Sequence, residues 1–218
     1  MEFLEYLADN TEDLLQLTYE HIVITVTAVG TATLIGMLLG ILTYRTGRPR
    51  ELSLAVTGTF LTIPSLALYG ILAAWPQFGL GLGATSVLVA LTLYGLLPIV
   101  RNTIVGLREV DPAIVESAQG MGMGRIKRLL RIELPLAWPV ILTGMRVSTL
   151  LLLGIATLGA YIRGPGLGND IFAGLARIGT PDAVNLVLGG MLGVLVLAVG
   201  FDLLYVLINR LTTSRGLR

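Results

Sequence analysis

The sequence predicts an all-α integral membrane protein with five transmembrane helices. Of its 218 residues, 54% are hydrophobic and 13% are charged, whereas soluble domains carry about 25% charged residues. The mean hydropathy is +0.82. Several uncharged runs could form helices of about 20 residues, the length that crosses the hydrocarbon core of a lipid bilayer. This composition argues against a soluble globular protein, and the net charge of +1 gives no reason to expect a nucleic-acid partner.

The first three expected spans cover residues 22–44, 52–74 and 84–101, because charged residues are avoided at membrane depth. The second and third come from one uncharged run over residues 52–100. A single helix of that length would measure roughly 73 Å, more than twice the thickness of the bilayer core. The run must therefore fold back, and segment 75–83, with a proline and closely spaced glycines, offers the turn.

The fourth and fifth expected spans, residues 138–162 and 183–208, each contain a charged residue. We expect Arg146 to extend to the cytoplasmic headgroups or to meet an acidic loop residue. Asp202 is expected to pair with Arg210 or to reach the membrane interface. His21 precedes the first span and is expected to lie at an interface.

Basic residues concentrate on one side of this topology. Twelve of the fifteen lie in the connections after spans one and three or in the C-terminal tail, whereas the first twenty residues contain six acidic residues and no basic one. Connections rich in lysine and arginine remain in the cytoplasm. The N-terminus is therefore expected outside the cell, and the C-terminus in the cytoplasm.

The longest polar segment, residues 102–137, is the expected cytoplasmic loop. Asp111 and Pro112 are typical of a helix N-cap followed by proline at the first helical position. Glycines at 120, 122 and 124 should end this helix, and a second short helix should begin at Arg125. Periodicity alone allows two interpretations: an amphipathic connector on the lipid headgroups, or a docking element for a soluble partner.

The spacing within this loop resembles the signature of the permease subunits of ATP-binding-cassette (ABC) importers. That signature reads EAA, three residues, G, nine residues, I, one residue, LP. The matching residues, with serine replacing the first alanine, are Glu116, Ser117, Ala118, Gly122, Ile132, Leu134 and Pro135. The resemblance implies that these residues couple the permease to an ATPase, so segment 102–137 becomes a coupling loop.

The likeness covers nearly the whole chain and is greatest to the glycine betaine, carnitine and choline branch. The runs that carry it include 62–68, 97–103, 120–123 and 133–137. It implies a single permease domain over residues 1–218 with a MetI-like ABC importer core, in a bacterial or archaeal plasma membrane. It also implies ATP-driven alternating access and three kinds of partner: a second permease subunit, identical or not, two cytoplasmic ATP-binding subunits, and an extracytoplasmic substrate-binding protein.

The chain is not expected to be an enzyme. A phosphate-binding loop needs glycines followed by lysine and Ser/Thr, but the single lysine, Lys127, follows isoleucine. The absence of cysteine excludes thiol catalysis and cysteine zinc sites. We therefore expect no catalytic residue, metal site or cofactor in this chain, with ATP and magnesium bound by the partner subunit.

Prolines inside the second and third spans mark a candidate solute pathway. Each removes a backbone hydrogen bond and permits a kink, which either fits the helix to its neighbours or shapes the pathway. Aromatic rings there would attract a quaternary ammonium group by about 0.5–2 kcal/mol. The candidate pathway residues are Thr62, Pro64, Ser65, Tyr69, Tyr94 and Pro98.

Two pairs of glycines have the spacing that lets membrane helices approach closely, at positions 36 and 40 and at positions 189 and 193. We expect them to pack within the subunit rather than across a dimer seam.

Three other functions are less consistent with the residues. A permease of the same architecture could carry methionine or another amino acid. An ion-gradient-driven carrier or channel predicts inverted repeats or buried acidic sites. A membrane-embedded hydrolase needs a nucleophile with histidine or paired acids inside the bilayer, and the one histidine precedes the first span.

Overall fold

The computed structural model describes residues 3–75, 77 and 80–213. Over these residues the chain contains helices and loops and no strand, which confirms the predicted all-α fold class. A π-helical turn, Leu129–Glu133, joins α7 to α8, and a 3-10 turn, Gly159–Ile162, follows α8. The helices are α1 (Phe3–Asp9), α2 (Thr11–Thr43), α3 (Arg48–Thr62), α4 (Ser65–Ala74), α5 (Ala84–Arg108), α6 (Pro112–Gly120), α7 (Arg125–Arg128), α8 (Leu134–Leu158), α9 (Gly168–Ala176) and α10 (Ala183–Thr212).

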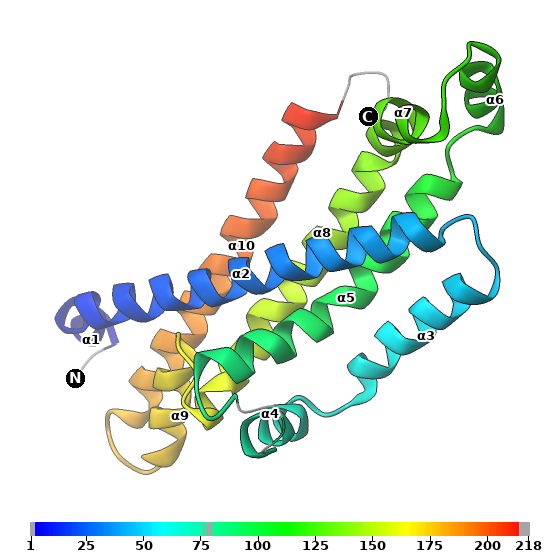
Figure 1. The fold of residues 1–218 in the computed structure, drawn as a ribbon. Coiled ribbons are helices and arrows are strands. Elements are labelled where there is room, and N and C mark those ends of the chain that lie inside the picture. Colours follow the sequence, from blue (N-terminus) through cyan, green and yellow to red (C-terminus); the bar gives the residue numbers. More distant parts are fainter. Residues whose placement is uncertain (1–2, 76, 78–79, 214–218) are drawn as a thin grey trace.

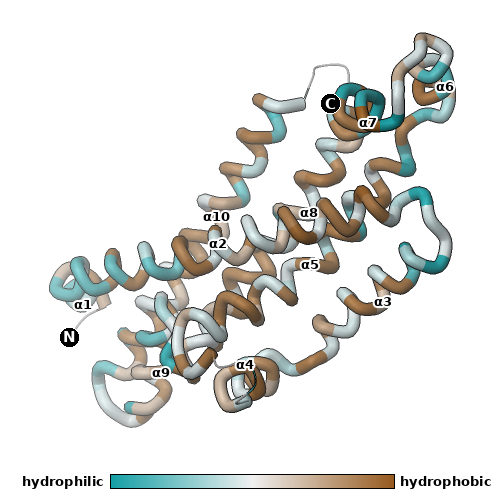
Figure 2. The backbone as a smooth tube through the Cα atoms, in the orientation of Figure 1, coloured by the Kyte–Doolittle hydropathy of each residue, from teal (hydrophilic) through white to brown (hydrophobic). Residues whose placement is uncertain are grey.

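Within the described residues, four helical segments are long and apolar enough to cross a membrane. They are Thr11–Thr43, Ala84–Arg108, Arg125–Ile162 and Ala183–Thr212. A fifth span is present if α3 and α4 are counted together. Figure 2 shows these helices hydrophobic along their middle and more hydrophilic near α1 and around α6 and α7.

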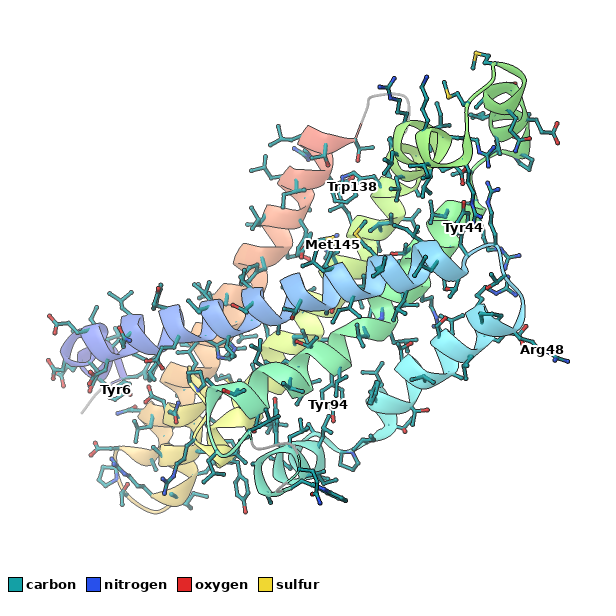
Figure 3. The ribbon with its side chains drawn as sticks, viewed as in Figure 1. Tyr6, Tyr44, Arg48, Tyr94, Trp138 and Met145 are labelled. Atoms are coloured by element: carbon teal, nitrogen blue, oxygen red, sulfur yellow. The ribbon has the colours of Figure 1, made fainter. Side chains whose placement is uncertain are left out.

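The second expected span, residues 52–74, is not one straight helix. Its two parts, α3 and α4, are bent by 95° at a short break. Proline disfavours the helical conformation of the residue before it, and Ile63 accordingly adopts φ −75° and ψ 128°. The hydroxyl of Tyr94, a residue of α5 that is labelled in Figure 3, donates a hydrogen bond of 2.7 Å to the Ile63 carbonyl. Pro64 therefore breaks this span, a larger effect than the expected kink.

The core is built around α5, which packs against both α2 and α8 (Figure 1). Ala28 from α2, Leu91 from α5 and Leu152 from α8 belong to one buried cluster. Helix α3 packs against α5, and α10 packs against α8 and α9. Helices α6 and α7 and the last turns of α10 lie at one end, here named the loop end, whereas α1 and α9 lie at the opposite end (Figure 1).

Both glycine pairs pack within the subunit, as the sequence analysis predicted. A Cβ atom on Gly36 would lie 2.9 Å from Ile99 Cγ2, and one on Gly40 would lie 2.6 Å from Thr103 Cβ. A Cβ atom on Gly189 would lie 3.0 Å from Tyr6, and one on Gly193 would lie 2.9 Å from Leu167. The first pair thus brings α2 against α5, and the second brings α10 against α1 and the segment before α9.

Replacing Gly40 by alanine is expected to destabilise the protein by about 1–3 kcal/mol, because the added methyl group overpacks the α2–α5 contact. Gly30 on the same helix is the matched control, since a Cβ atom there meets nothing within 4 Å. Thermal unfolding of the purified protein in detergent measures both variants. Equal unfolding temperatures for the Gly40→Ala and Gly30→Ala proteins would show that the α2–α5 contact tolerates the extra methyl group.

His21 lies in the core rather than at an interface, so that expectation was wrong. Its side chain is fully buried, and Nε2 lies 3.1 Å from the Leu153 carbonyl oxygen, to which it donates. Gly166 packs directly on it, since a Cβ atom there would lie 2.7 Å from His21 Nδ1. The close backbone approach at Gly166 contributes to this burial. His21 is also inside a helix rather than before one, since α2 begins at Thr11, eleven residues before the expected span.

Arg146 and Asp202 form an ion pair with each other, which differs from both expectations. The Arg146 Nε atom donates to Asp202 Oδ1 at 2.6 Å, so α8 and α10 are joined by opposite charges. Two neutral hydrogen bonds join the same helices, one from Trp138 to Thr212 and one between Thr149 and Tyr205, each 2.8 Å long. The partners lie 56 residues apart in the sequence, and for this reason helix periodicity could not identify them.

Candidate coupling site

The predicted loop helix is present as α6, and its boundaries follow from local signals. The Asp111 carboxylate accepts a hydrogen bond of 2.8 Å from the backbone N–H of Ala113, and Pro112 occupies the first helical position. Beyond the end of α6, Gly122 adopts φ +78°, a conformation that glycine adopts without steric cost. Helix α6 is therefore a short capped helix between two turns.

The motif residues fall into two groups in the structure. Glu116, Ser117 and Gly122 are exposed on and after α6, and Ala118 is buried beneath them. Ile132 and Leu134 are partly buried and Pro135 is exposed, all near the junction of the π-helical turn with α8. The first group can thus contact a partner, while the second lies where the loop joins the fourth span.

Apolar side chains are exposed around α6 and α7, next to the basic residues of the loop. Their exposed fractions are 42% for Ile114, 69% for Met121, 73% for Ile126 and 58% for Leu130. Neighbouring exposed apolar side chains with a polar surround are typical of an interaction surface. The loop end therefore has the chemistry of a protein docking surface.

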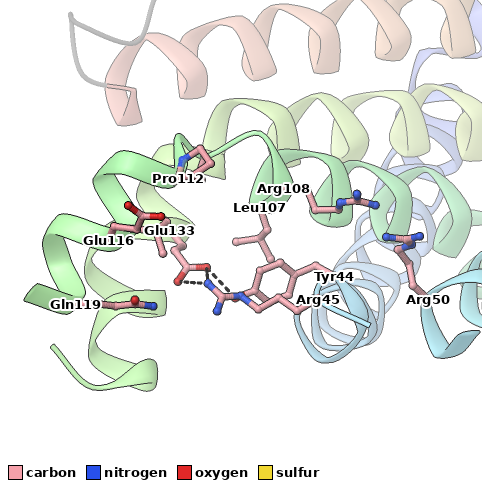
Figure 4. Close-up of a pocket in the computed structure, with 11 residues that line it drawn as sticks. Tyr44, Arg45, Arg50, Leu107, Arg108, Pro112, Glu116, Gln119 and Glu133 are labelled. Atoms are coloured by element: carbon pink, nitrogen blue, oxygen red, sulfur yellow. Dashed lines mark hydrogen bonds and ion pairs between the residues drawn. The ribbon is translucent and has the colours of Figure 1, made fainter. Parts of the chain in front are cut away.

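The most connected residue near the loop is Glu133, which the sequence analysis did not single out. Its carboxylate is 1% exposed. It accepts hydrogen bonds from Tyr44 Oη at 2.7 Å and from Arg45 Nη2 at 3.0 and 3.1 Å (Figure 4). Arg128 Nε donates a further hydrogen bond to it at 2.8 Å. We call Glu133, Tyr44, Arg45 and Arg128 the Glu133 cluster.

The Glu133 cluster ties the end of the first span to the joint between the loop and the fourth span. Tyr44 and Arg45 directly follow α2, whereas Arg128 ends α7. Burial raises the pKa of the Tyr44 hydroxyl, and its hydrogen bond to Glu133 raises it further. The hydroxyl is therefore a permanent donor at physiological pH. In the sequence, Glu133 could have been noticed as an acidic residue that directly precedes the apolar pair Leu134-Pro135 at the start of the fourth span.

A cavity of about 490 Å³ lies between α6 and the Glu133 cluster. Figure 4 shows Glu116 and Gln119 from α6 facing Glu133 and Arg45 from the cluster, with Arg50 and Arg108 nearby. Motif residue Glu116 is thereby brought to the rim of the same cavity as the buried carboxylate. A partner that moves α6 would act on this cavity and on the residues that close it.

Some of the candidate pathway residues are buried in the structure and others are exposed. Tyr69 and Tyr94 are buried, with exposed fractions of 0% and 2%, and the Tyr69 hydroxyl donates to the Ile155 carbonyl at 3.0 Å. Both hydroxyls therefore satisfy backbone carbonyls in the core, and a pathway role for these two rings stays a prediction.

The remaining candidates lie around the two prolines. Thr62 and Pro64 are exposed at the α3–α4 break, and Ser65 is partly exposed at the start of α4. Pro98 lies within an uninterrupted α5, so its predicted kink does not become a break like that at Pro64. A pathway role for these four residues stays a prediction.

Comparison with known proteins identifies the family. Residues 32–214 match the family described as binding-protein-dependent transport system inner membrane component. The chain belongs to this family. It is 38% identical to the choline transport system permease protein OpuBB of Bacillus subtilis, over 98% of this chain and 95% of that protein. It is 34% identical to the osmoprotectant import permease protein OsmW of Salmonella typhimurium, over the full length of both chains.

Solved structures establish the fold of this inner-membrane component. An inward-facing structure of the MetNI methionine ABC transporter aligns with a TM-score of 0.81 and 21% identity, covering 98% of this chain and all of that chain. An amino acid ABC transporter with histidines aligns with a TM-score of 0.78 and 18% identity, covering 96% of this chain and 98% of that chain. The predicted MetI-like ABC permease core is therefore confirmed, whereas identities this low carry no information about the solute.

Proposed function

We propose that this chain is the permease subunit of a binding-protein-dependent ABC importer for quaternary-ammonium osmoprotectants such as glycine betaine, carnitine and choline. The observation that carries the proposal is similarity over at least 98% of the chain, at 34% to 38% identity, to permeases named for choline, carnitine, glycine betaine or osmoprotectant transport. The exposed helix α6, with its near-complete ABC permease signature, supports the importer assignment.

In this proposal the loop end faces the cytoplasm. Twelve of the fifteen basic residues of the chain lie in the connections and tail that a cytoplasmic loop end would contain, and such connections remain inside. Two ATP-binding subunits, which hold ATP and magnesium, dock on α6, and this chain itself hydrolyses nothing. A second permease subunit completes the pathway, and a binding protein delivers the solute from the opposite side.

The coupling mechanism follows from the connections of α6. Movement of a docked ATPase displaces α6, and the Glu133 cluster conveys the displacement to α2 and α8, to which its residues are attached. Rigid-body motion of packed helices then exchanges an inward-facing pathway for an outward-facing one. Glu116, Ser117, Ala118 and Gly122 form the partner side of this coupling, and Ile132, Leu134 and Pro135 form the membrane side.

Uptake measurements test the proposal. The chain is expressed with its ATPase subunit and binding protein in a host that lacks osmoprotectant uptake, and labelled glycine betaine, carnitine, choline and methionine are supplied under osmotic stress. We expect saturable uptake of at least one quaternary-ammonium solute, lost when the ATPase subunit is omitted. Uptake of methionine alone would instead support an amino-acid importer.

A further inference from the structure

The Arg146–Asp202 ion pair lies deep in the membrane. Trp138, a residue type that favours membrane interfaces, is eight residues before Arg146, and Thr212 at the end of α10 is ten residues after Asp202. At 1.5 Å per residue these separations correspond to about 12 and 15 Å. With Trp138 and Thr212 taken as the level of the membrane surface, this depth is close to the middle of a hydrocarbon core about 30 Å thick.

The ion pair is also accessible from outside the subunit. The Arg146 side chain is 42% exposed and the Asp202 side chain is 35% exposed. Charged side chains at this depth face the interior of a helix bundle or a water-filled cavity, because exposure to lipid is costly. The exposed side of the pair is therefore turned away from lipid in the assembled transporter.

A small cavity lined by polar and apolar side chains leads from Arg146 toward the loop end. On α8, Pro139, Thr143 and Arg146 follow one another at helical spacing, and all three line a cavity of about 150 Å³. On α10, Val206, Asn209 and Arg210 line the same cavity. The cavity thus extends from Arg146 to the polar side chains of Thr143, Asn209 and Arg210, which lie nearer the loop end.

From this arrangement we propose that the α8–α10 face carrying Arg146 and Asp202 forms the wall of the inner half of the solute pathway, and that the two side chains contact the charged groups of the solute. The inference rests on the proposed function. Asp202 attracts a quaternary ammonium group, and Arg146 binds a carboxylate. A zwitterion such as glycine betaine offers an additional partner to each member of the ion pair, whereas choline, which has no carboxylate, offers one only to Asp202.

The proposal that the α8–α10 face forms a pathway wall can be tested by measuring how fast cysteines introduced on that face react with a water-soluble thiol reagent. The chain contains no cysteine, so Thr143→Cys and Asn209→Cys each introduce one thiol. The control is Leu207→Cys, because Leu207 is 52% exposed and lies about 200° around α10 from Asn209. Nucleotide-free inside-out vesicles containing the complete transporter are treated with the impermeant cation (2-trimethylammonioethyl) methanethiosulfonate, and modification of this chain is followed by its mass.

We expect the thiols at 143 and 209 to react at least about tenfold faster than the thiol at 207, because thiols ionise poorly in apolar surroundings. Reaction of all three at the same rate would overturn the proposal, since this face would then be lipid-exposed or covered by the second permease subunit. This result does not depend on which solute is carried, so it is separable from failure of the uptake experiment.

The proposed contacts of Arg146 and Asp202 with the solute can be tested by asking whether solute slows modification of the thiol at position 209. Glycine betaine and choline should each slow its modification. In the Arg146→Gln background the half-protecting concentration of glycine betaine should rise at least about tenfold, and that of choline should change less, because only glycine betaine loses a charged partner. Arg146→Lys keeps the positive charge, so it should leave the half-protecting concentrations of both solutes close to those of the unsubstituted side chain. Absence of protection by either solute, or equal changes for both, would overturn the solute contact.

Discussion

Replacing Glu116 by arginine is expected to abolish solute uptake and stimulated ATP hydrolysis while the permease remains folded. Glu116 is exposed on α6, and within the described part of the chain its carboxylate has no hydrogen-bond or ion-pair partner. Replacing it therefore breaks no hydrogen bond or ion pair among the described residues of the isolated subunit. At a protein interface, losing a desolvated charge contact costs about 2–5 kcal/mol, which corresponds to about 30-fold or more in affinity.

The matched control is Glu51→Arg, because Glu51 is also exposed near the loop end but lies on α3, outside α6. Co-purification of the ATPase subunit, uptake and ATPase activity in proteoliposomes measure the effect. Loss of all three in the Glu116→Arg protein, with the Glu51→Arg protein unaffected, is the expected pattern. Normal uptake by the Glu116→Arg transporter would show that α6 is not the docking element.

Replacing Glu133 by alanine is expected to cost about 3–5 kcal/mol of stability, because it leaves buried charged donors without an acceptor. Arg128 is 6% exposed and loses its carboxylate partner, and the Tyr44 hydroxyl loses its acceptor as well. Tyr44→Phe removes one donor and leaves the two arginine contacts, so it should cost about 1–3 kcal/mol.

Thermal or denaturant unfolding in detergent measures these losses, with Glu51→Ala as the surface control. Glu51 pairs weakly with Arg50 at 3.9 Å and is 71% exposed, so its removal should change stability by about 0–1 kcal/mol. A loss for Glu133→Ala no larger than that of the control would show that the Glu133 cluster does not hold the loop joint to α2.

Features set by neighbouring residues were predictable from the sequence. The N-cap at Asp111, the proline at position 112 and the glycine turn at 122 placed α6 correctly. Four of the expected spans coincide with helical segments that are long and apolar enough to cross a membrane, because avoidance of charge in the bilayer can be read along the sequence alone.

Features that depend on contacts between distant helices could not be predicted. Two of the three partners of Glu133, Tyr44 and Arg45, lie 89 and 88 positions away from it. Several arginines were available to pair with either Glu133 or Asp202. Likewise, the sequence indicated that Tyr69 and Tyr94 lie near prolines, but only the packing shows that their hydroxyls satisfy carbonyl groups in the core. Pro64 predicted a perturbed helix, whereas the 95° angle depends on how α4 packs against α5 and α8.

The unbroken helical segment Arg125–Ile162 has a mechanical consequence. With 38 residues it is about 57 Å long. The π-helical turn changes the hydrogen-bonding pattern locally, but the helix continues through it. A tilt of about 5° around one end of a rod of that length displaces the other end by about 5 Å. A small angular change imposed at the loop end is thus amplified into a displacement of several ångströms at the opposite end of the helix.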